Sequence, residues 1–123
     1  MPPRGGRWLA HGSFVAALWI GLGLAVPEPV QAQAKALPAF TATVTDGVFA
    51  PARLVVPAGE RVKIILKNEG PGPLEFENDD MRIEKIVAAG AGSFVVLPPL
   101  KPGTYEFIDE FNIATGVLVI EAQ

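Results

Sequence analysis

The sequence predicts an all-β protein, a Greek-key β-sandwich of seven to eight short strands preceded by a signal peptide. From Phe40 onward, strand patterns and turn signals alternate about every 8–12 residues, which is the spacing of a sandwich. No stretch after that residue keeps the 3.6-residue periodicity of a long helix. An apolar run near the N-terminus sets the first third of the chain apart from the folded domain.

The expected strands are runs of alternating or continuous apolar residues between turns rich in Gly, Pro and Asp. In residues 61–68, apolar residues alternate with mostly basic ones, as in a strand with one face in water. Residues 78–87 could hold a helical turn, with Ile83, Ile86 and Val87 as its apolar stripe. The seven stretches that read as strands are 40–44, 53–56, 61–68, 74–77, 93–97, 103–109 and 117–120.

The N-terminal segment has the build of a secretory signal peptide. Arg4 and Arg7 give it a basic start, residues 13–26 form an apolar run, and small residues occupy Ala32 and Ala34 before a cleavage site. A transmembrane anchor is the alternative, but the run is shorter than the ~20 residues that span a bilayer core. The sequence thus predicts a signal peptide at 1–34, a linker at 35–39, a domain at 40–123, a periplasmic location and no stable membrane span after cleavage.

Size and charge narrow the possible functions of the mature chain. Cleavage removes Arg4, Arg7, Glu28 and the one histidine, His11, so that a formal net charge of −3 becomes −4. An acidic chain without a basic patch is not expected to bind nucleic acid. The sequence contains no Cys, so an exported domain of this size must rely on its core rather than on disulfides. No nucleophile motif supports an enzyme.

The C-terminal part of the chain, residues 103–120, reads as a strand, a short loop and a second strand. It resembles the ligand loop of the cupredoxins, in which G-x-Y-x-F-x-C-x-x-H leads through a glycine into the last strand. Gly103, Tyr105, Phe107 and Gly116 match that pattern. The resemblance implies a cupredoxin-like sandwich for this domain.

Two further segments extend the resemblance over nearly the whole mature chain. Residues 49–59 resemble the F-x-P-x-x-I-x-V-x-x-G entry of small cupredoxins, and residues 62–68 resemble the strand before their first ligand. The runs at 75–77, 84–87 and 100–105 are similar to the EfeO-type cupredoxin-like domains of bacterial periplasmic iron-uptake systems. This resemblance implies metal-ion handling or uptake, and an iron permease or a periplasmic iron-binding protein as partner.

The residues at the ligand positions do not suit blue copper. Asp109 stands where the pattern has Cys, Asn112 stands where it has His, and Leu74 falls at the first His position. A type 1 site needs a thiolate and two imidazoles, and the mature chain has no Cys or His to supply them from elsewhere. The sequence therefore excludes a blue-copper centre and electron transfer through one.

Carboxylates are the remaining candidate ligands. Oxygen ligands suit hard ions such as Fe³⁺, Mn²⁺, Ca²⁺ or Mg²⁺, and the cofactor left open is an iron or copper ion held by oxygen atoms. A solvated acidic rim and a docking surface for a basic partner are the alternatives. The residues predicted as metal ligands are Glu75, Glu77, Glu84, Asp109 and Glu110.

Asp109 differs from the other acids because it shares the inward face of Tyr105 and Phe107. A buried carboxylate needs a cation, a hydrogen-bond donor or a metal. By analogy with the cupredoxin fold, Lys85 and Arg82 are the nearest candidate cations, and a salt bridge is favoured over a role as metal ligand. The aromatic residues, Phe94 among them, are expected in the core, except that Phe111 in the loop has an exposed contact role as its alternative.

Two functions follow as hypotheses. The first is a metal-binding or metal-delivery module that uses carboxylates, or an accessory to ferrous-iron oxidation or transport. The second is a metal-free interaction domain that kept the cupredoxin frame, lost its site and docks to a periplasmic or membrane partner. The response of the fold to added metal ions separates the two.

Overall fold

The computed structural model describes residues 36–123, together with Gly12 and Gly23. The predicted signal peptide therefore lies almost wholly outside the described residues. The folded domain lies within the unit Ala34–Gln123. Within the described residues, no helix has the length and apolar character needed to cross a membrane.

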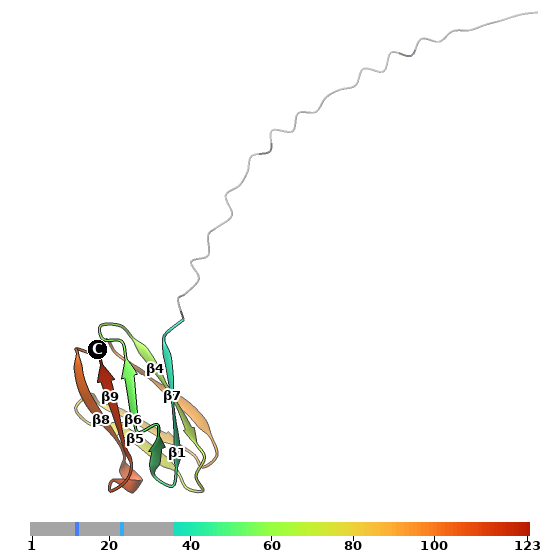
Figure 1. The fold of residues 1–123 in the computed structure, drawn as a ribbon. Coiled ribbons are helices and arrows are strands. Elements are labelled where there is room, and N and C mark those ends of the chain that lie inside the picture. The colour runs from blue at the N-terminus through green and yellow to red at the C-terminus, as the bar shows by residue number, and fades with distance from the viewer. Residues whose placement is uncertain (1–11, 13–22, 24–35) are drawn as a thin grey trace, which may run out of the picture. The chain divides into compact units, whose positions relative to one another are not determined.

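The domain is a sandwich of two β-sheets with one short 3₁₀ helix, η1 (Glu110–Asn112) (Figure 1). One sheet has four strands in the order β2-β1-β4-β7, and the other has five in the order β3-β9-β8-β5-β6. The strands are β1 (Ala39–Thr45), β2 (Val48–Ala50), β3 (Arg53–Val56), β4 (Val62–Asn68), β5 (Leu74–Asn78), β6 (Ile83–Val87), β7 (Gly92–Leu97), β8 (Gly103–Asp109) and β9 (Val117–Ala122). The predicted all-β sandwich is confirmed.

Both sheets mix parallel and antiparallel pairs. β1 runs parallel to β4, and β3 runs parallel to β9, while the other neighbours are antiparallel. β8 and β9 form the hairpin expected from the C-terminal pattern, joined through η1. This hairpin brings η1 and its flanking residues to the end of the sandwich opposite the C-terminus (Figure 1).

Two strands of the described domain, β2 and β6, lie outside the seven stretches that were expected as strands. β6 takes the place of the predicted helical turn. Residues 83–87 form β6, which pairs antiparallel with β5. The helical interpretation was wrong because the chain reverses just before this stretch. Arg82 has φ of 53°, and Asn78 Oδ1 accepts a hydrogen bond of 2.8 Å from the Met81 amide, which together make a tight turn. After that turn, the sheet pairing with β5 outweighs the weak helical stripe.

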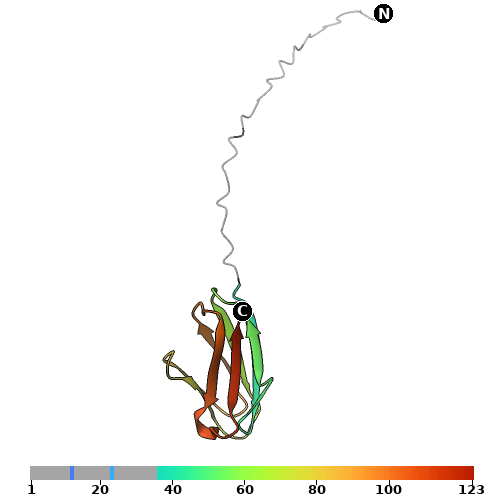
Figure 2. The same ribbon diagram turned by 60° about the vertical axis from the view of Figure 1, so that its left-hand side comes forward.

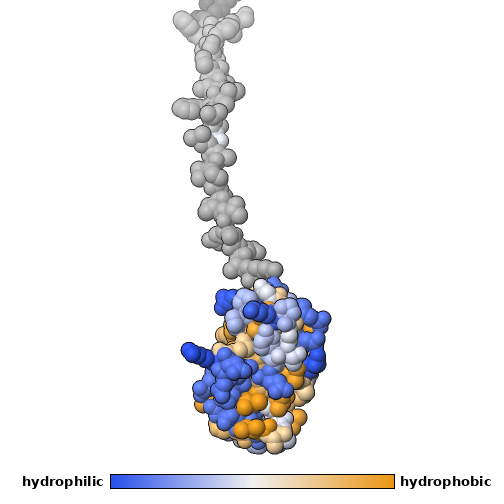
Figure 3. Space-filling model, turned by 90° about the vertical axis from the view of Figure 1, so that its left-hand side faces the viewer, coloured by the Kyte–Doolittle hydropathy of each residue, from blue (hydrophilic) through white to orange (hydrophobic). Residues whose placement is uncertain are grey.

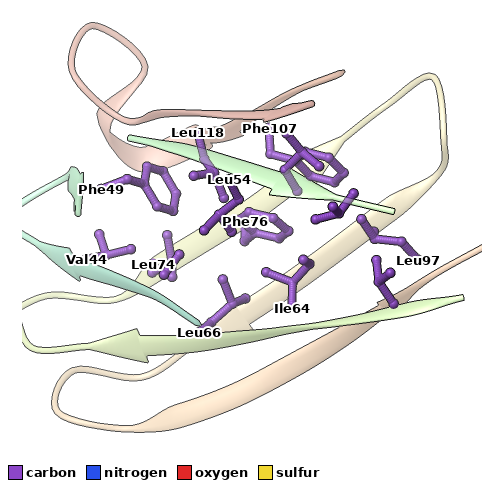
Figure 4. Close-up of a cluster of buried hydrophobic side chains, with 14 of the residues drawn as sticks. Val44, Phe49, Leu54, Ile64, Leu66, Leu74, Phe76, Leu97, Phe107 and Leu118 are labelled. Carbon is purple, nitrogen blue, oxygen red and sulfur yellow. The ribbon is translucent and has the colours of Figure 1, made fainter. Parts of the chain in front are cut away.

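The core lies between the two sheets and is built on three phenylalanines (Figure 4). The rings of Phe76 and Phe107 stack at 4.8 Å between centroids with planes 6° apart, and Phe49 meets Phe76 edge-on at 6.1 Å. Alternation along β4 and β5 supplies the aliphatic residues around them, since every second side chain points inward. Each fully buried aliphatic side chain contributes about 1.5–3 kcal/mol of transfer free energy.

Phe94 lies outside this core, contrary to the expectation. Its side chain is 50% exposed on the outer face of the four-stranded sheet, opposite Ile65 of β4. Val95 and Leu97 take the inward positions of β7, and the period of two places Phe94 on the other face. The Nζ of Lys63 lies 4.2 Å from the ring centroid, so that a cation–π contact covers the exposed ring.

Candidate functional site

The three positions that correspond to the copper ligands converge on one cavity. A cavity of about 210 Å³ lies at the end of the sandwich that carries η1, and Leu74, Asp109 and Asn112 all line it. The β1–β2 turn and the loop from Gly70 to Pro73 form the rest of its wall. The fold thus brings together the residues that the cupredoxin pattern singles out.

Asp109 is buried, with 1% of its side chain exposed, and it is satisfied by hydrogen bonds. Its Oδ1 accepts from the backbone amides of Glu75 at 3.1 Å and Phe111 at 3.2 Å. Its Oδ2 accepts from Nδ2 of Asn112 at 2.8 Å. The predicted salt bridge to Lys85 or Arg82 is wrong, because these three donors replace the cation. Asp109 also caps η1 through the bond from Phe111.

Two glycines let Asn112 and Asp109 pack closely against the neighbouring loops. Gly47 has φ of 70°, and a Cβ there would overlap the side chain of Asn112. A Cβ on Gly116 would lie 2.6 Å from Cβ of Asp109 and 2.9 Å from the carbonyl oxygen of Asn112. The glycine that the sequence pattern matched is therefore required by contact with the ligand-position residues.

Leu74 fills the first ligand position with hydrocarbon. It is 1% exposed and belongs to the hydrophobic core, where Figure 4 shows it beside Val44 and Leu66. A histidine at this position would expose an imidazole nitrogen to the cavity, whereas Leu74 presents only methyl groups to it. This side chain extends the core into the position where the cupredoxin pattern has its first His.

Asn68 holds the loop that forms the cavity wall. Its Nδ2 lies within hydrogen-bonding distance of the carbonyl oxygens of Gly72, Val87 and Ala88, at 2.8 to 3.2 Å, and its Oδ1 accepts from the Gly70 amide at 3.1 Å. Asn68 was not among the predicted site residues. Its burial could have been predicted, because the two-residue alternation that buries Val62, Ile64 and Leu66 also turns residue 68 inward.

A type 1 copper ion does not fit this set of side chains. The positions supply one carboxylate, one amide and one alkyl group in place of a thiolate and two imidazoles. Both carboxylate oxygens of Asp109 already accept hydrogen bonds, and one comes from the residue at the second ligand position. These three positions therefore act as part of the structural frame.

The other predicted ligands lie on the outer face of the five-stranded sheet. Glu75 and Glu77 project outward from β5, and Glu77 pairs across strands with Glu84 of β6. Glu110 begins η1 and follows β8, the other neighbour of β5. We call Glu75, Glu77, Glu84 and Glu110 the outer acidic cluster. Asp109 faces the opposite way, into the cavity, so the five predicted residues do not form one site.

Neighbouring carboxyl groups raise the pKa values of two members of the outer acidic cluster, Glu75 and Glu77. A hydrogen bond with Glu110 is the main cause that raises the pKa of Glu77 from 4.5 to about 7, followed by partial burial and neighbouring acidic charges. Partial burial also raises the pKa of Glu75, with a hydrogen bond to Glu84 as the next cause. These neighbours favour the protonated forms of Glu75 and Glu77.

The cluster is not arranged as a preformed metal cage. Among residues 36–123, no three His, Cys, Asp or Glu side chains are grouped closely enough to hold one ion. The carboxyl pairs Glu75–Glu84 and Glu77–Glu110 instead offer two oxygen-rich positions side by side. A metal-binding role for Glu75, Glu77, Glu84, Asp109 and Glu110 remains a prediction.

Three solved structures share this fold. The metal-binding domain of the Cu(I)-exporting P-type ATPase CopA of Streptococcus pneumoniae D39, solved with Cu(I), has a TM-score of 0.59 and 11% identity over 69% of this chain and 84% of that one. A copper-binding protein in its apo form has a TM-score of 0.59 and 19% identity over 72% and 92% of the two chains. Auracyanin B has a TM-score of 0.58 and 14% identity over 73% and 93%. At these identities, the likenesses show the fold alone.

Sequence comparison gives the family. An uncharacterized protein of Rickettsia prowazekii (strain Madrid E) is 34% identical over 80 residues, which make up 63% of this chain and 64% of that protein. The chain thus spans less than two thirds of that relative's length. The family model described as "Cupredoxin-like domain" matches residues 14–120, which include every described strand up to most of β9. The chain belongs to the cupredoxin-like domain family.

Proposed function

We propose that this chain is a periplasmic cupredoxin-like protein that takes part in metal-ion handling or uptake through carboxylate oxygens rather than a type 1 copper centre. Iron is the ion that the EfeO-type resemblance suggests, and copper is the ion named for two of the solved neighbours. The periplasmic setting rests on the signal-peptide pattern of residues 1–34. An iron permease or a periplasmic iron-binding protein is the proposed partner.

The raised pKa of Glu77, about 7, is the observation that carries this proposal. The hydrogen bond with Glu110 is the main cause of this shift, and repulsion between two ionised carboxylates so close together adds to it. A cation placed between the two groups would relieve the same repulsion. The outer acidic cluster therefore has an electrostatic reason to exchange protons for metal ions near neutral pH.

The pairwise arrangement indicates the kind of binding. A cation at Glu77 and Glu110 would gain two carboxylates from the protein and complete its coordination shell with water. Such a site is open and exchanges its ion readily, which suits transfer to a partner better than storage. Hard ions such as Fe³⁺ and Mn²⁺ are preferred by these oxygen ligands.

Thermal unfolding with added ions tests the proposal. Fe³⁺-citrate, Cu²⁺, Mn²⁺ and Ca²⁺ are added in turn at constant ionic strength, so that screening is the same in every sample. We expect one transition metal to stabilise the fold by about 2.7 kcal/mol at a hundredfold excess over its Kd. The double substitution Glu75→Gln/Glu77→Gln should abolish that effect, whereas the charge-matched Glu60→Gln/Glu69→Gln should retain it. Small and equal shifts for all ions would refute the metal role.

An interaction domain without metal is the second candidate, favoured by two exposed apolar residues at the end of the sandwich that carries η1. Phe111 is 51% exposed and Ile113 is 57% exposed, on and just after η1. Two large apolar side chains so close together in sequence are typical of a contact surface. If Phe111→Ser/Ile113→Ser weakens binding to an iron permease or an iron-binding protein while Glu75→Gln/Glu77→Gln does not, the docking role is the better description.

A further inference from the structure

A second hollow of the domain shares no lining residue with the cavity at the copper-ligand positions. It has a volume of about 720 Å³ and lies between β8 and the turn that joins β5 to β6. Its lining includes Glu77, Asp79, Asp80 and Glu106, with Met81 as its apolar member on the turn. We call this hollow the acidic groove. In Figure 2, the yellow tip of the β5–β6 hairpin stands out from the body of the domain beside β8.

The groove exists because β5 and β8 pair only over a short length. Their register joins Phe76 to Asp109 and Glu77 to Ile108, and the turn after Asn78 then leads the hairpin away. On its other edge, β8 pairs with β9 at six positions. The first half of β8, from Gly103 to Phe107, is therefore an open strand edge within the described part of the domain.

The backbone groups on this edge point into the groove. The Asp109 amide donates to the carbonyl oxygen of Gly116 across the hairpin, so odd-numbered residues of β8 face β9. Thr104 and Glu106 consequently face the groove. The carbonyl oxygen of Glu106 accepts a hydrogen bond of 2.8 Å from Nδ2 of Asn78, which confirms this direction. The amides of Thr104 and Glu106 have no backbone partner in the described structure.

The charge of the groove indicates what can occupy it. Four carboxylates line it, and no Lys or Arg does. Two copies of such an edge would repel each other, which is how proteins prevent strand edges from pairing with themselves. An extended segment carrying Lys or Arg would both accept hydrogen bonds from the amides of Thr104 and Glu106 and meet the acidic walls.

From this geometry we infer that the acidic groove is a docking site for a basic, extended segment of a partner protein, which adds as a strand to the edge of β8 at Thr104 and Glu106. Backbone hydrogen bonds would supply most of the affinity, and the carboxylates would select basic side chains. The groove shares Glu77 with the outer acidic cluster, but the strand edge at Thr104 and Glu106 and the groove carboxylate of Asp80 lie outside that cluster, so the two proposals can fail separately.

The probe is a capped peptide of alternating Lys and Val, titrated into the purified chain and followed by amide NMR shifts and hydrogen exchange. We expect shifts and protection at Thr104 and Glu106, and neither with the matched Glu–Val peptide. Two further versions of the peptide carry N-methyl groups on the backbone amides of either the odd or the even residues. Each version therefore lacks the hydrogen-bond donors along one edge of the extended peptide. Only one version should lose binding, because a strand pairs through one edge.

Substitutions then test the acidic walls. Asp80→Asn/Glu106→Gln should weaken peptide binding by about fivefold, since two exposed ion pairs are lost. The charge-matched Glu60→Gln/Glu69→Gln should change it by less than about twofold. Binding that survives both N-methylated peptides, that maps to other residues, or that falls equally in both double variants would overturn the inference. No binding of the Lys–Val peptide would also overturn it.

Discussion

Asn112 donates a hydrogen bond of 2.8 Å from Nδ2 to Oδ2 of Asp109, so that the residues at the second His and Cys positions of the cupredoxin pattern bind each other directly. In a type 1 site, the metal joins the ligands at these positions. Here a side-chain hydrogen bond and two backbone amides hold the same loop in place. The ligand loop is therefore closed by the protein's own groups and requires no ion.

Replacing Asp109 should destabilise the domain strongly. Asp109→Ala removes the acceptor of three hydrogen bonds at a buried position, and we expect a loss of about 3 kcal/mol in the free energy of unfolding. Asp109→Asn should cost less, because Asn112 can turn its amide to present oxygen to the new donor. Urea unfolding of the three proteins measures both losses, and an equal loss for both variants would contradict the role of Oδ2.

A double-mutant cycle isolates the bond between these two side chains. Asn112→Asp places two carboxylates against each other and should destabilise the fold at neutral pH. The exchanged pair Asp109→Asn/Asn112→Asp restores one donor and one acceptor, so the coupling free energy should reach about 1–2 kcal/mol. Additive losses in the two single variants would show that the contact contributes nothing.

Gly116→Ala should be far more costly than an alanine elsewhere in the same region. The added Cβ would lie 2.6 Å from Cβ of Asp109, which forces a backbone shift at a cost of about 1–3 kcal/mol. Gly72→Ala is the matched control, because a Cβ there meets nothing within 4 Å. The two thermal midpoints, measured under one condition, give the comparison, and equal values would contradict the close packing.

Added Cu²⁺ should produce no intense visible absorption band with this chain. Such a band requires a thiolate that donates charge to the metal, and the sequence contains no Cys. The triple variant Leu74→His/Asp109→Cys/Asn112→His places all three strong ligands around the existing cavity and should gain the band. A strong band with the unaltered chain would mean that the ligand positions have been assigned wrongly.

The outer acidic cluster should make stability fall as the pH rises. The pKa of Glu77 is about 7 in the folded chain against an ordinary 4.5, so the folded state holds a proton that the unfolded chain releases. The stability from this proton is fully present below pH 4.5 and is lost as the pH rises through about 7. Glu77→Gln should match the wild type at pH 4.5 and exceed its melting temperature at pH 8. A constant difference across that range would contradict the assignment.

The mature protein from native cells should begin near Gln33 or Lys35. Residues 1–34 carry the basic start, the apolar run and the small-residue site of a cleaved signal peptide. Intact-mass measurement of the native protein identifies the first residue. A mass that includes Met1 would refute cleavage.

The sandwich could be predicted because periodicity reports which face of a strand is buried. Leu74 and Phe76 alternate with Glu75 and Glu77, and the structure places the first two inward and the others outward. The pattern of Tyr105 and Phe107 likewise placed Asp109 inward correctly. The identity of its partners could not be predicted, because the Glu75 amide and the Asn112 side chain approach Asp109 only through sheet pairing and the turn of η1.

For the acidic side chains too, the sequence predicts which face they occupy but not which residues they meet. That Glu77 points outward follows from sequence, but its nearness to Glu84 depends on the register between β5 and β6, which hairpin geometry decides. The predicted helical turn at residues 78–87 hid this hairpin. The acidic groove was missed for the same reason, since it exists only where β5 parts from β8. On the face of the domain that Figure 3 shows, hydrophilic residues cover much of the surface, and hydrophobic residues gather toward the lower end of the view.

The place of β9 between β3 and β8 has a consequence for the order in which the five-stranded sheet can form. β3 pairs in this sheet with β9 alone, although β4 to β8 separate the two in the chain. β3 is synthesised early, and it has no partner in this sheet until β9, the last strand, has been synthesised. Contacts so distant in sequence form slowly because a long loop must close first. The five-stranded sheet therefore cannot close around β9 until the C-terminal strand has been synthesised, whereas the sheet of β2, β1, β4 and β7 does not depend on it.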